Sequence, residues 1–576
     1  MGTGAVPCAT GHRRAGPMAA LLGVALALAL SAYDSSRAAP SGVVTPKVHA
    51  RSAASTLNQT DSEFVLVISD GKSEAVADWA GIPPEQLSRS DVELRDGVLT
   101  PLSNTLLTTR QLSSLARELG SLKIRADAVK VAPNTTIILP GLSLSLDGEH
   151  VVIGGTIDVS GARAGSLTIE ASEVVFESTS RMYANGDVGG GNIFVGGEWQ
   201  GAGGLRPAHR IEIASGARIE ASAREEGSGG TVVFWADPSN ATAVVDARGH
   251  ITARGGRRFG DGGRIETSAP RLNVDEIRVD TSPSSTIGRS GTWLIDPRDI
   301  TISTLTSSNA TGVSPFTSTV ESGLTPANIQ ASTIVAALLT GNVTVSTAGD
   351  GSMSGDITVS AEISAGGANK LTLLADGDII LSARIRRTST GSVDLTATSG
   401  VVRGSGNLAL SGGTVTLTQG GTNTSGAFYT GAITGTGTSV VKLGSGTLVV
   451  SGASNFTGST TISEGTLKLG AMDKWADDSA VSIASGATLD LNDFDDTVGS
   501  ISGAGSITLG TGTLTAGGNN ESTTYSGIMS GAGGRFTKQG DGVLTLSGAN
   551  TYTRVPALIE SRIRRGSTSS MAQRST

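Results

Sequence analysis

Apolar and polar residues alternate through the middle of this chain, and the alternation returns with a 22-residue period. Gly355–Ile363 reads Gly-Asp-Ile-Thr-Val-Ser-Ala-Glu-Ile, and Gly377–Ile385 repeats it as Gly-Asp-Ile-Ile-Leu-Ser-Ala-Arg-Ile. Alternation of this kind is typical of a strand with one buried face. A strand repeat of about 20 to 30 residues with glycine at its corners predicts the coils of a parallel β-solenoid.

Three leucines indicate which side of each strand faces inward. Leu373, Leu395 and Leu417 follow one another at the 22-residue step. Because corresponding residues of successive coils stack about 4.8 Å apart, these leucines are predicted to form one inward ladder. A single coil buries too little apolar surface to offset the entropy of ordering its backbone, so the coils must stack. We therefore expect an all-β parallel β-helix of about 20 coils, roughly 95 Å long.

Other repeats flank the regular coils. Residues 121–302 contain glycine-bounded strands such as Gly155–Val159, separated by long glycine loops. In the last part of the chain a second repeat has a 96-residue step: Tyr429–Gly435 returns as Tyr525–Gly531, and Lys442–Ala453 returns as Lys538–Ala549.

Near the start, Phe64–Ile68 has the pattern of a buried strand, and Leu112, Leu115 and Leu119, followed by Gly120, have the spacing and stop signal of a helix. These elements are expected to cap the first coil.

The patterns divide the chain into a signal peptide at 1–38, an N-terminal cap or irregular region at 39–120, a β-helix with glycine-rich coils at 121–302, a Ser/Thr-rich irregular segment at 303–350, regular 22-residue coils at 351–428, the later strand repeats at 429–553 and a basic disordered tail at 554–576.

The segment 1–38 has the features of a secretory signal peptide. The apolar run Met18–Ala32 follows Arg13 and Arg14, and Ser36–Ala38 offers a cleavage site with small residues. The only cysteine of the chain is Cys8, so cleavage leaves a mature protein without cysteine. A chain that crosses the outer membrane unfolded has a reason to avoid disulfides. Chance in a sequence of low complexity is the other explanation.

Composition favours a scaffold over a compact enzyme core. Of 576 residues, 80 are glycine, whereas aromatic residues make up 3% and charged residues 16%. Tight turns and flat stacked coils need glycine and small β-formers. The net charge of -8 and the lack of a basic stripe with interleaved aromatic residues argue against nucleic acid as a partner.

Two segments resemble known families of bacterial surface proteins. Gly291–Ile302 contains Trp-Leu-Ile-Asp-Pro and resembles a segment of filamentous-haemagglutinin-like exoproteins, and the 96-residue repeat resembles the autotransporter-associated β-strand repeat. The resemblance implies a right-handed β-helix that is exported to, or through, the outer membrane. It implies structural roles for the motif residues, which are Gly291, Trp293, Leu294, Asp296, Pro297 and Asp299.

The resemblance also implies an adhesin-like protein, secreted or exposed at the cell surface, that is exported through the periplasm. Its expected partners are glycans or proteins on host or bacterial surfaces, and an outer-membrane export pore acting in trans is a further expected partner. No asparagine-rich secretion motif occurs near the mature N-terminus, and the repeat stops at Thr553 before a basic end. A truncated passenger without activity of its own is therefore a second hypothesis.

A third hypothesis is an enzyme that acts on polysaccharides, because β-helices also carry out that chemistry. It needs two carboxylates a few ångströms apart. The candidates are Asp477 with Asp478, and the group Asp493, Asp495 and Asp496, all of which we interpret as solvated turn residues. The histidines are single and widely spaced, which predicts no metal site. We expect no catalytic, cofactor-binding or metal-binding residue and a protein that is not an enzyme.

Within the Trp-Leu-Ile-Asp-Pro motif, structural roles are favoured over binding roles. Asp296 and Asp299 could coordinate an ion, but an Asx-type turn that stabilises a corner is the preferred interpretation. Trp293 is expected to pack inside a coil or under a loop rather than to bind a sugar.

Overall fold

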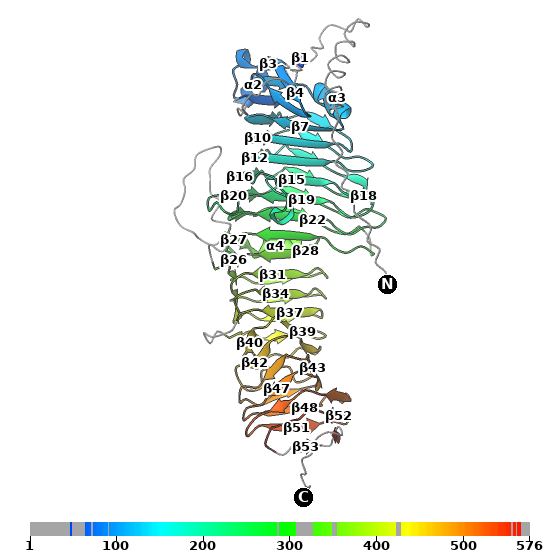
Figure 1. The fold of residues 1–576 in the computed structure, drawn as a ribbon, viewed down its shortest axis with the longest axis vertical. Helices are drawn as coiled ribbons and strands as arrows, with labels where there is room; N and C mark the ends of the chain where they lie inside the picture. Colours follow the sequence, from blue (N-terminus) through cyan, green and yellow to red (C-terminus); the bar gives the residue numbers. More distant parts are fainter. Residues whose placement is uncertain are drawn as a thin grey trace, which may run out of the picture.

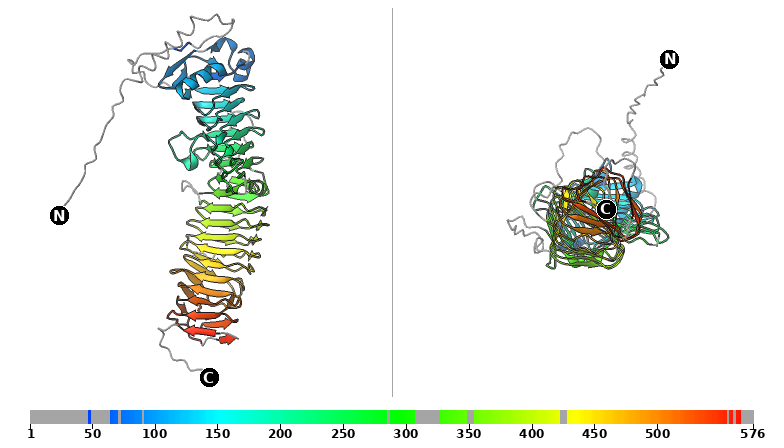
Figure 2. Two further views of the ribbon diagram at one scale, coloured as in Figure 1. Left: turned by 90° about the vertical axis from the view of Figure 1, so that its right-hand side faces the viewer. Right: turned by 90° about the horizontal axis from the view of Figure 1, so that it is seen from below.

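The protein is seen in a computed structural model that describes residues 47–48, 64–70, 73–89, 91–284, 287–306, 327–347, 354–421, 428–554, 557–559 and 562–565. The expected signal peptide lies outside the described residues. The described chain forms a long rod with its first coils at one end and its last coils at the other (Figure 1). Seen along the long axis, the coils lie over one another (Figure 2).

The rod is a parallel β-helix. Among the described strands, the single antiparallel pair is β4 (Asp91–Arg95) with β5 (Val98–Pro101) in the N-terminal region. In the regular part, each coil contributes three short strands in turn, and each strand pairs in parallel with its counterpart one coil further on. The coil therefore has three faces, and the core is the space that they enclose.

The first strands of the coils form the longest row. They are β10 (Ser143–Ile153), β12 (Ser166–Phe176), β15 (Asn192–Val195), β19 (Thr231–Trp235), β22 (Arg264–Ser268), β25 (Thr292–Asp296), β28 (Asn342–Ser346), β31 (Leu371–Ala375), β34 (Val393–Ala397), β37 (Thr414–Gln419), β39 (Ser439–Leu443), β41 (Thr460–Ile462), β43 (Ala480–Ile483), β46 (Ser500–Gly503), β49 (Thr523–Tyr525), β52 (Val543–Leu546) and β54 (Arg562–Arg565).

Because β10 and β12 each pair with two shorter strands, they cover two faces. The second strands of the other coils are β16 (Arg210–Ile213), β20 (Val244–Ala247), β23 (Arg271–Asn273), β26 (Ile300–Ser303), β27 (Ala327–Gln330), β29 (Ile357–Val359), β32 (Ile379–Leu381), β35 (Val402–Gly404), β40 (Thr447–Val450), β42 (Thr466–Leu469), β44 (Thr488–Asp490), β47 (Ser506–Thr508) and β50 (Met529–Ser530).

The third strands are β9 (Thr136–Ile138), β11 (Thr156–Asp158), β13 (Arg181–Tyr183), β17 (Arg218–Glu220), β21 (His250–Thr252), β24 (Arg278–Asp280), β30 (Ile363–Ala365), β33 (Ile385–Arg387), β36 (Leu408–Leu410), β38 (Ile433–Thr434), β45 (Asp496–Val498), β48 (Thr513–Ala516), β51 (Arg535–Gln539) and β53 (Ala557–Ile559). Helix α4 (Ala331–Ala337) contacts both β24 and β30 and lies between them. Outside the three faces, β14 (Gly186–Val188), β18 (Ala223–Glu226) and the short 3-10 helix η2 (Trp199–Gly201) belong to longer loops.

The N-terminal region covers the first coil. Its elements are β1 (Lys47–Val48), β2 (Val65–Ile68), α2 (Ser73–Ala80), η1 (Pro84–Gln86), β3 (Ser88–Arg89), β4, β5, β6 (Thr105–Leu107), α3 (Thr109–Leu119), β7 (Ser121–Arg125) and β8 (Ala128–Val131).

Helix α3 forms where the leucine spacing predicts it. Thr108 and Gln111 make a reciprocal capping box at its start, and Gly120 ends it in the left-handed conformation at φ 75°. Leu112 and Leu115 are buried and belong to the main core. The helix contacts β7 and β9, so its apolar face covers the first coil.

The inward leucine ladder is confirmed. Leu373 pairs with Leu395, and Leu395 pairs with Leu417, in parallel register on β31, β34 and β37. All three side chains are fully buried. Since each coil adds one aliphatic side chain to the same column, every coil shields the one before it from water.

The rod has fewer coils than a uniform 22-residue step predicts. The row from β7 to β54 contains 18 successive strands. Some coils are much longer than the regular ones, since Asn192 pairs with Thr231 and Thr292 pairs with Asn342. Loops lengthen these coils because a loop that leaves a corner and returns does not disturb the strand register.

The 96-residue repeat places equivalent side chains in the same surroundings. The buried hydroxyls of Tyr429 and Tyr525 donate to the carbonyls of Gly406 and Gly505, at 2.9 and 2.8 Å. The buried ammonium of Lys442 donates to the carbonyls of Leu443 and Gly444, and Lys538 does the same with Gln539 and Gly540.

These lysines are cations inside a β-helix. Burial lowers the pKa of Lys442 to about 8, and the charge of Glu464 opposes this shift in part. Burial also lowers the pKa of Lys538. Gly444 and Gly540 follow in the left-handed conformation, both at φ 73°. The repeat thus encodes one corner, whose inward-facing carbonyls are hydrogen-bonded by a lysine.

Two segments are more regular than expected. Within 303–350, residues 327–347 form β27, α4 and β28, and β28 pairs with β25 and β31, so the chain returns to the coil register. In the tail expected to be disordered, the backbones of β53 and β54 pair in parallel with β51 and β52. The edge strands of the preceding coil present unpaired backbone groups that bind a further strand.

Exchange of one ladder leucine tests the inward assignment. Leu395→Asp places a carboxylate in a dry core and should lower the free energy of unfolding by several kcal/mol. Thr396→Asp, one residue on and facing outward, should stay within about 0.5 kcal/mol of the native chain. Denaturant midpoints of the two variants measure the difference, and equal midpoints would contradict the assignment.

Candidate functional site

The first four residues of the Trp-Leu-Ile-Asp-Pro motif lie on β25, which ends at Asp296, and the motif is built into the core. Trp293 is 1% exposed, and its indole N–H donates to the hydroxyl of Thr267 at 3.2 Å. Gly291 lies so close to the preceding coil that a Cβ atom there would stand 2.0 Å from the carbonyl oxygen of Gly263. Leu294 and Pro297 are buried. Trp293 therefore packs inside the coil and presents no surface to a sugar.

Asp299 starts a ladder of carboxylates instead of an Asx-type turn within its own corner. It accepts a hydrogen bond from the backbone N–H of Asp356 at 2.9 Å. Asp356 accepts from the N–H of Asp378 at 2.7 Å, and Asp378 accepts from the N–H of Val401 at 2.8 Å. Each aspartate directly precedes a strand of the second face, so the ladder joins four stacked coils through backbone groups at their corners.

Asp296 has a different environment from that expected of a turn. It ends β25 and makes a hydrogen bond with Ser346, and burial together with the nearby Glu266 carboxylate raises its pKa to about 8. Glu266 is itself fully buried and accepts hydrogen bonds from the Gln200 N–H at 2.7 Å and the Ser268 hydroxyl at 2.8 Å. Glu266 thus fastens the loop around η2 to the sheet, and Asp296 joins β25 to β28.

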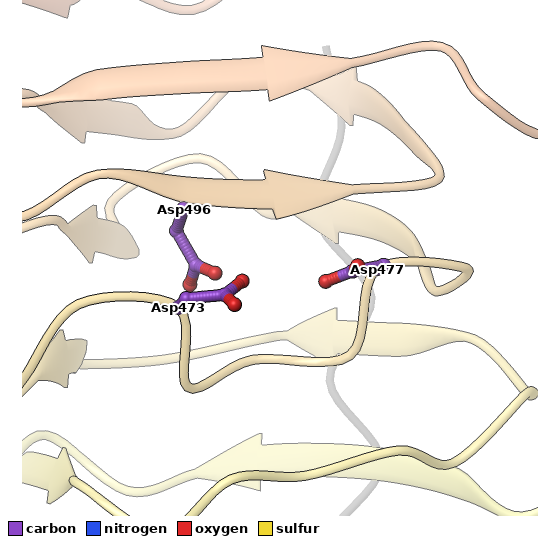
Figure 3. Close-up of side chains that lie close together, drawn as sticks. All are labelled: Asp473, Asp477 and Asp496. Atoms are coloured by element: carbon purple, nitrogen blue, oxygen red, sulfur yellow. The ribbon is translucent and has the colours of Figure 1, made fainter.

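A group of three carboxylates forms at a corner of the later coils. Asp473 and Asp477 belong to the loop between β42 and β43, and Asp496 is the first residue of β45 on the next coil. Their carboxylate oxygens lie within 4.8 Å of one another, with the two loop residues facing the strand residue (Figure 3). The structure therefore brings together members of two separate clusters of the sequence, in which Asp477 stands with Asp478 and Asp496 with Asp495.

Trp475 fixes the loop that carries two of these acids. It is 2% exposed, its ring meets Phe456 edge-on at 5.4 Å between centroids, and its indole N–H donates to the Thr460 hydroxyl at 3.0 Å. The backbone N–H of Trp475 also donates to Asp496 at 3.3 Å. The anchored tryptophan therefore holds Asp473 and Asp477 against the strand.

The interpretation of all these aspartates as solvated turn residues is wrong for Asp496. Asp493 and Asp495 are exposed and accept backbone hydrogen bonds from Thr511 and Thr513, as turn residues do. Asp496, however, is 5% exposed. Alternation along β45 turns it inward, which a count of neighbouring aspartates in the sequence does not reveal.

Burial raises the pKa of Asp496 to about 7, and the charges of Asp473 and Asp477 add to the effect. The pKa of Asp477 is raised too, first by burial and then by its acidic neighbours. In the part of the chain that the structure describes, these three acids have no cationic partner. Such a group can share a proton or offer oxygen ligands of the kind that calcium takes.

The histidines do not come together with these acids. His150 lies 3.1 Å from Glu173, and His209 lies 3.0 Å from the Asn240 side chain. His250 belongs to β21 on the third face, and His49 lies outside the described residues. Across the described ranges, no helix is long and apolar enough to cross a membrane.

The buried acid gives a testable dependence of stability on pH. Because the folded pKa of about 7 lies above the ordinary value of 3.8, the protonated form is favoured by folding. The protonated carboxyl of Asp496 contributes fully to stability below about pH 4, and this contribution is lost as the pH rises through about 7. Asp496→Asn should remove this loss, which amounts to a few kcal/mol at most.

Denaturation at pH 4 to 8, in a chelating buffer, measures the slope for the native chain and the variant. Asp495→Asn, an exposed neighbour, is the matched control and should leave the slope unchanged. An unaltered slope in Asp496→Asn would show that the carboxyl is ionised in the folded protein throughout this range.

The later coils match a known family of repeats, and part of the chain is similar to a known adhesin. Residues 440–469 and 536–554 match the passenger-associated-transport-repeat family. The chain is 38% identical over 108 residues to the adhesin BmaC autotransporter of Brucella suis biovar 1 (strain 1330), a match that covers 18% of this chain and 3% of the adhesin's own length. This protein thus carries segments that match passenger-associated transport repeats on a parallel β-helix, and over 108 residues it is similar to an autotransporter adhesin.

Proposed function

We propose that this chain is an adhesin-like passenger, displayed at the bacterial surface or secreted, which attaches to glycans or proteins on other surfaces. The observation that carries the proposal is the similarity to an autotransporter adhesin together with the transport repeats. An outer-membrane pore acting in trans is the export partner that we propose for it.

The rod gives attachment a physical mechanism. Loops of different length leave a core that repeats from coil to coil, so the contact surfaces are carried along the rod while the scaffold stays constant. Each contact can be weak, because many rods on one surface engage many receptors and the combined avidity exceeds the single affinity by about 10²- to 10⁴-fold.

We propose binding without turnover. Support comes from the motif tryptophan, which is buried in the core, and from histidines that lie apart from the acid group. The group Asp473, Asp477 and Asp496 is the feature that favours the alternative, a polysaccharide-acting enzyme, because one of its acids holds a proton near neutral pH.

Clustering provides the test of attachment. The full chain, purified as a monomer, should bind cultured cells or extracellular matrix weakly, whereas beads densely coated with it should be retained about 100-fold more strongly. Beads coated with Leu395→Asp chain, whose coils are disrupted, are the control. Absence of binding at any density would contradict the proposal and favour an inactive passenger.

Turnover is tested on the same preparation. Incubation with polyuronates or arabinans should release no new reducing ends or unsaturated products. Cleavage that is lost in Asp496→Asn but kept in Asp495→Asn would replace the adhesin proposal with an enzyme.

A further inference from the structure

A row of basic side chains runs along the third face of the rod. Arg181, Arg218, His250 and Arg278 are the first residues of β13, β17, β21 and β24, and they pair with one another in parallel register. The residue after each of them is buried, so the first residue points outward. Stacked side chains of this kind lie about 4.8 Å apart, and the row therefore spans roughly 14 Å.

Like charges stacked in a sheet destabilise it unless something neutralises them. The guanidinium of Arg181 already has hydrogen-bond partners, since it donates to the carbonyls of Ser180 and Gly216. Arg218 and Arg278 are exposed and, within the described ranges, their guanidinium groups make no hydrogen bond or ion pair. Their guanidinium donors are free to bind an anion.

The carboxylates beside the row have other hydrogen-bond partners, and none of them forms an ion pair with Arg218 or Arg278 in the described part of the chain. Asp280 is held by Arg254 at 2.6 Å and by the Ser282 hydroxyl, also at 2.6 Å. Asp158, which ends the neighbouring strand β11, accepts from the N–H of Ser160 at 2.8 Å. Glu220 accepts from the Asn185 side chain at 3.4 Å. Each of these acids thus has a hydrogen-bond partner outside the row, although the charges of Glu220 and Asp280 also act on His250.

His250 stands between the two free arginines. Burial lowers its pKa, and the positive charges of Arg218 and Arg278 lower it further, against the opposing charges of Glu220 and Asp280. The imidazole is therefore neutral at pH 7 and offers one N–H donor without adding to the repulsion.

Two surface depressions meet at this row. One of about 640 Å³ is lined by Arg218, His250 and Arg278, by Arg248, and by Gln330 and Ser332 at the start of α4. The other, of about 520 Å³, shares Arg218 and His250 and is also lined by Glu220 and by two arginines, Arg224 and Arg254, that are each paired with an aspartate. The acid in the first depression is Glu276, and Arg248 is paired with Asp246.

We propose that this row, with its two depressions, binds a linear anionic polysaccharide through sulfate or carboxylate groups. Arg218 and Arg278 present guanidinium forks suited to such groups, while His250 and Ser332 supply neutral donors. The chain as a whole carries a net charge of -8, so the free cations of the row are a local feature. The proposal rests on the attachment function and names its ligand class.

Charge density favours a polysaccharide over nucleic acid. Double-stranded DNA carries one negative charge per roughly 1.7 Å, and such a dense polyanion would be repelled by the row of Asp158, Glu220 and Asp280 beside the arginines. A polysaccharide carries its anionic groups on a single strand and can place them at the arginines while it avoids the acids.

Immobilised heparin and hyaluronan test the contribution of sulfate, because heparin carries sulfate in addition to carboxylate and hyaluronan carries carboxylate alone. The full chain should bind heparin, and salt should weaken the binding by screening. Arg218→Ser and Arg278→Ser should each weaken it about tenfold, the effect of one charge-assisted hydrogen-bond group. Comparable binding to hyaluronan would assign the site to carboxylates.

The matched control is the double variant Arg384→Ser and Arg386→Ser. It removes the same charge from the third face near β33, where Arg384 pairs with Glu362 and Arg386 is an isolated exposed residue. Its binding should stay within about twofold of the native chain. Equal losses in the control and in the double variant Arg218→Ser and Arg278→Ser, or no binding of the native chain to either polymer, would overturn the proposal.

Failure of this site and failure of the proposed function give different results. If clustered native chain attaches to cells but binds neither polymer, the site is wrong and attachment stands. If the chain binds a polymer through Arg218 and Arg278 but clustered chain does not attach to cells, the site stands and the attachment function is wrong.

Discussion

Each coil of this protein depends on its two neighbours, because a coil by itself cannot satisfy its own backbone or bury its own side chains. Strand N–H and C=O groups pair between coils, and the aliphatic side chains form columns such as Leu373, Leu395 and Leu417. Stability in such a stack is the sum of interfaces between adjacent coils. Loops are outside these interfaces, which explains how coils of very different length share one register.

The same dependence determines where polar groups are buried. Asp299, Asp356 and Asp378 each accept a backbone N–H from the following coil. Lys442 and Lys538 place ammonium groups among inward-facing corner carbonyls. Buried polar groups are stable when hydrogen-bonded, and here the partner is usually a backbone group of the same or the next corner. The Trp-Leu-Ile-Asp-Pro motif and the 96-residue repeat encode such corners.

Much of the fold follows from the sequence because the pattern is local. The period of the apolar residues predicts the strands and the inward ladder, and the leucine spacing before Gly120 predicts α3. The irregular coils are harder to foresee. The steps from Arg181 to Arg218, from Arg218 to His250 and from His250 to Arg278 are all different in length, so no fixed period reveals that these residues form one row. The stacking of unequal coils is what aligns them.

The same limit on prediction from the sequence applies to the group Asp473, Asp477 and Asp496. Asp473 and Asp477 reach Asp496 because Trp475 anchors their loop and because β45 begins with an inward residue. Neither fact is visible from the spacing of the aspartates. Function on this scaffold comes from side chains that the stacking brings together, and sequence reasoning locates the scaffold more readily than the site.

The central claim is that the coils stack in parallel with a constant rise, and spin-label distances measure that rise directly. Cysteine pairs at outward positions, Thr344 with Thr461 and Thr344 with Ser502, are separated by five and seven strands in register. After removal of Cys8, electron–electron double resonance should give narrow distributions near about 24 and about 34 Å, as a rise of about 4.8 Å per coil requires. Distances that do not increase with the number of coils would contradict the account.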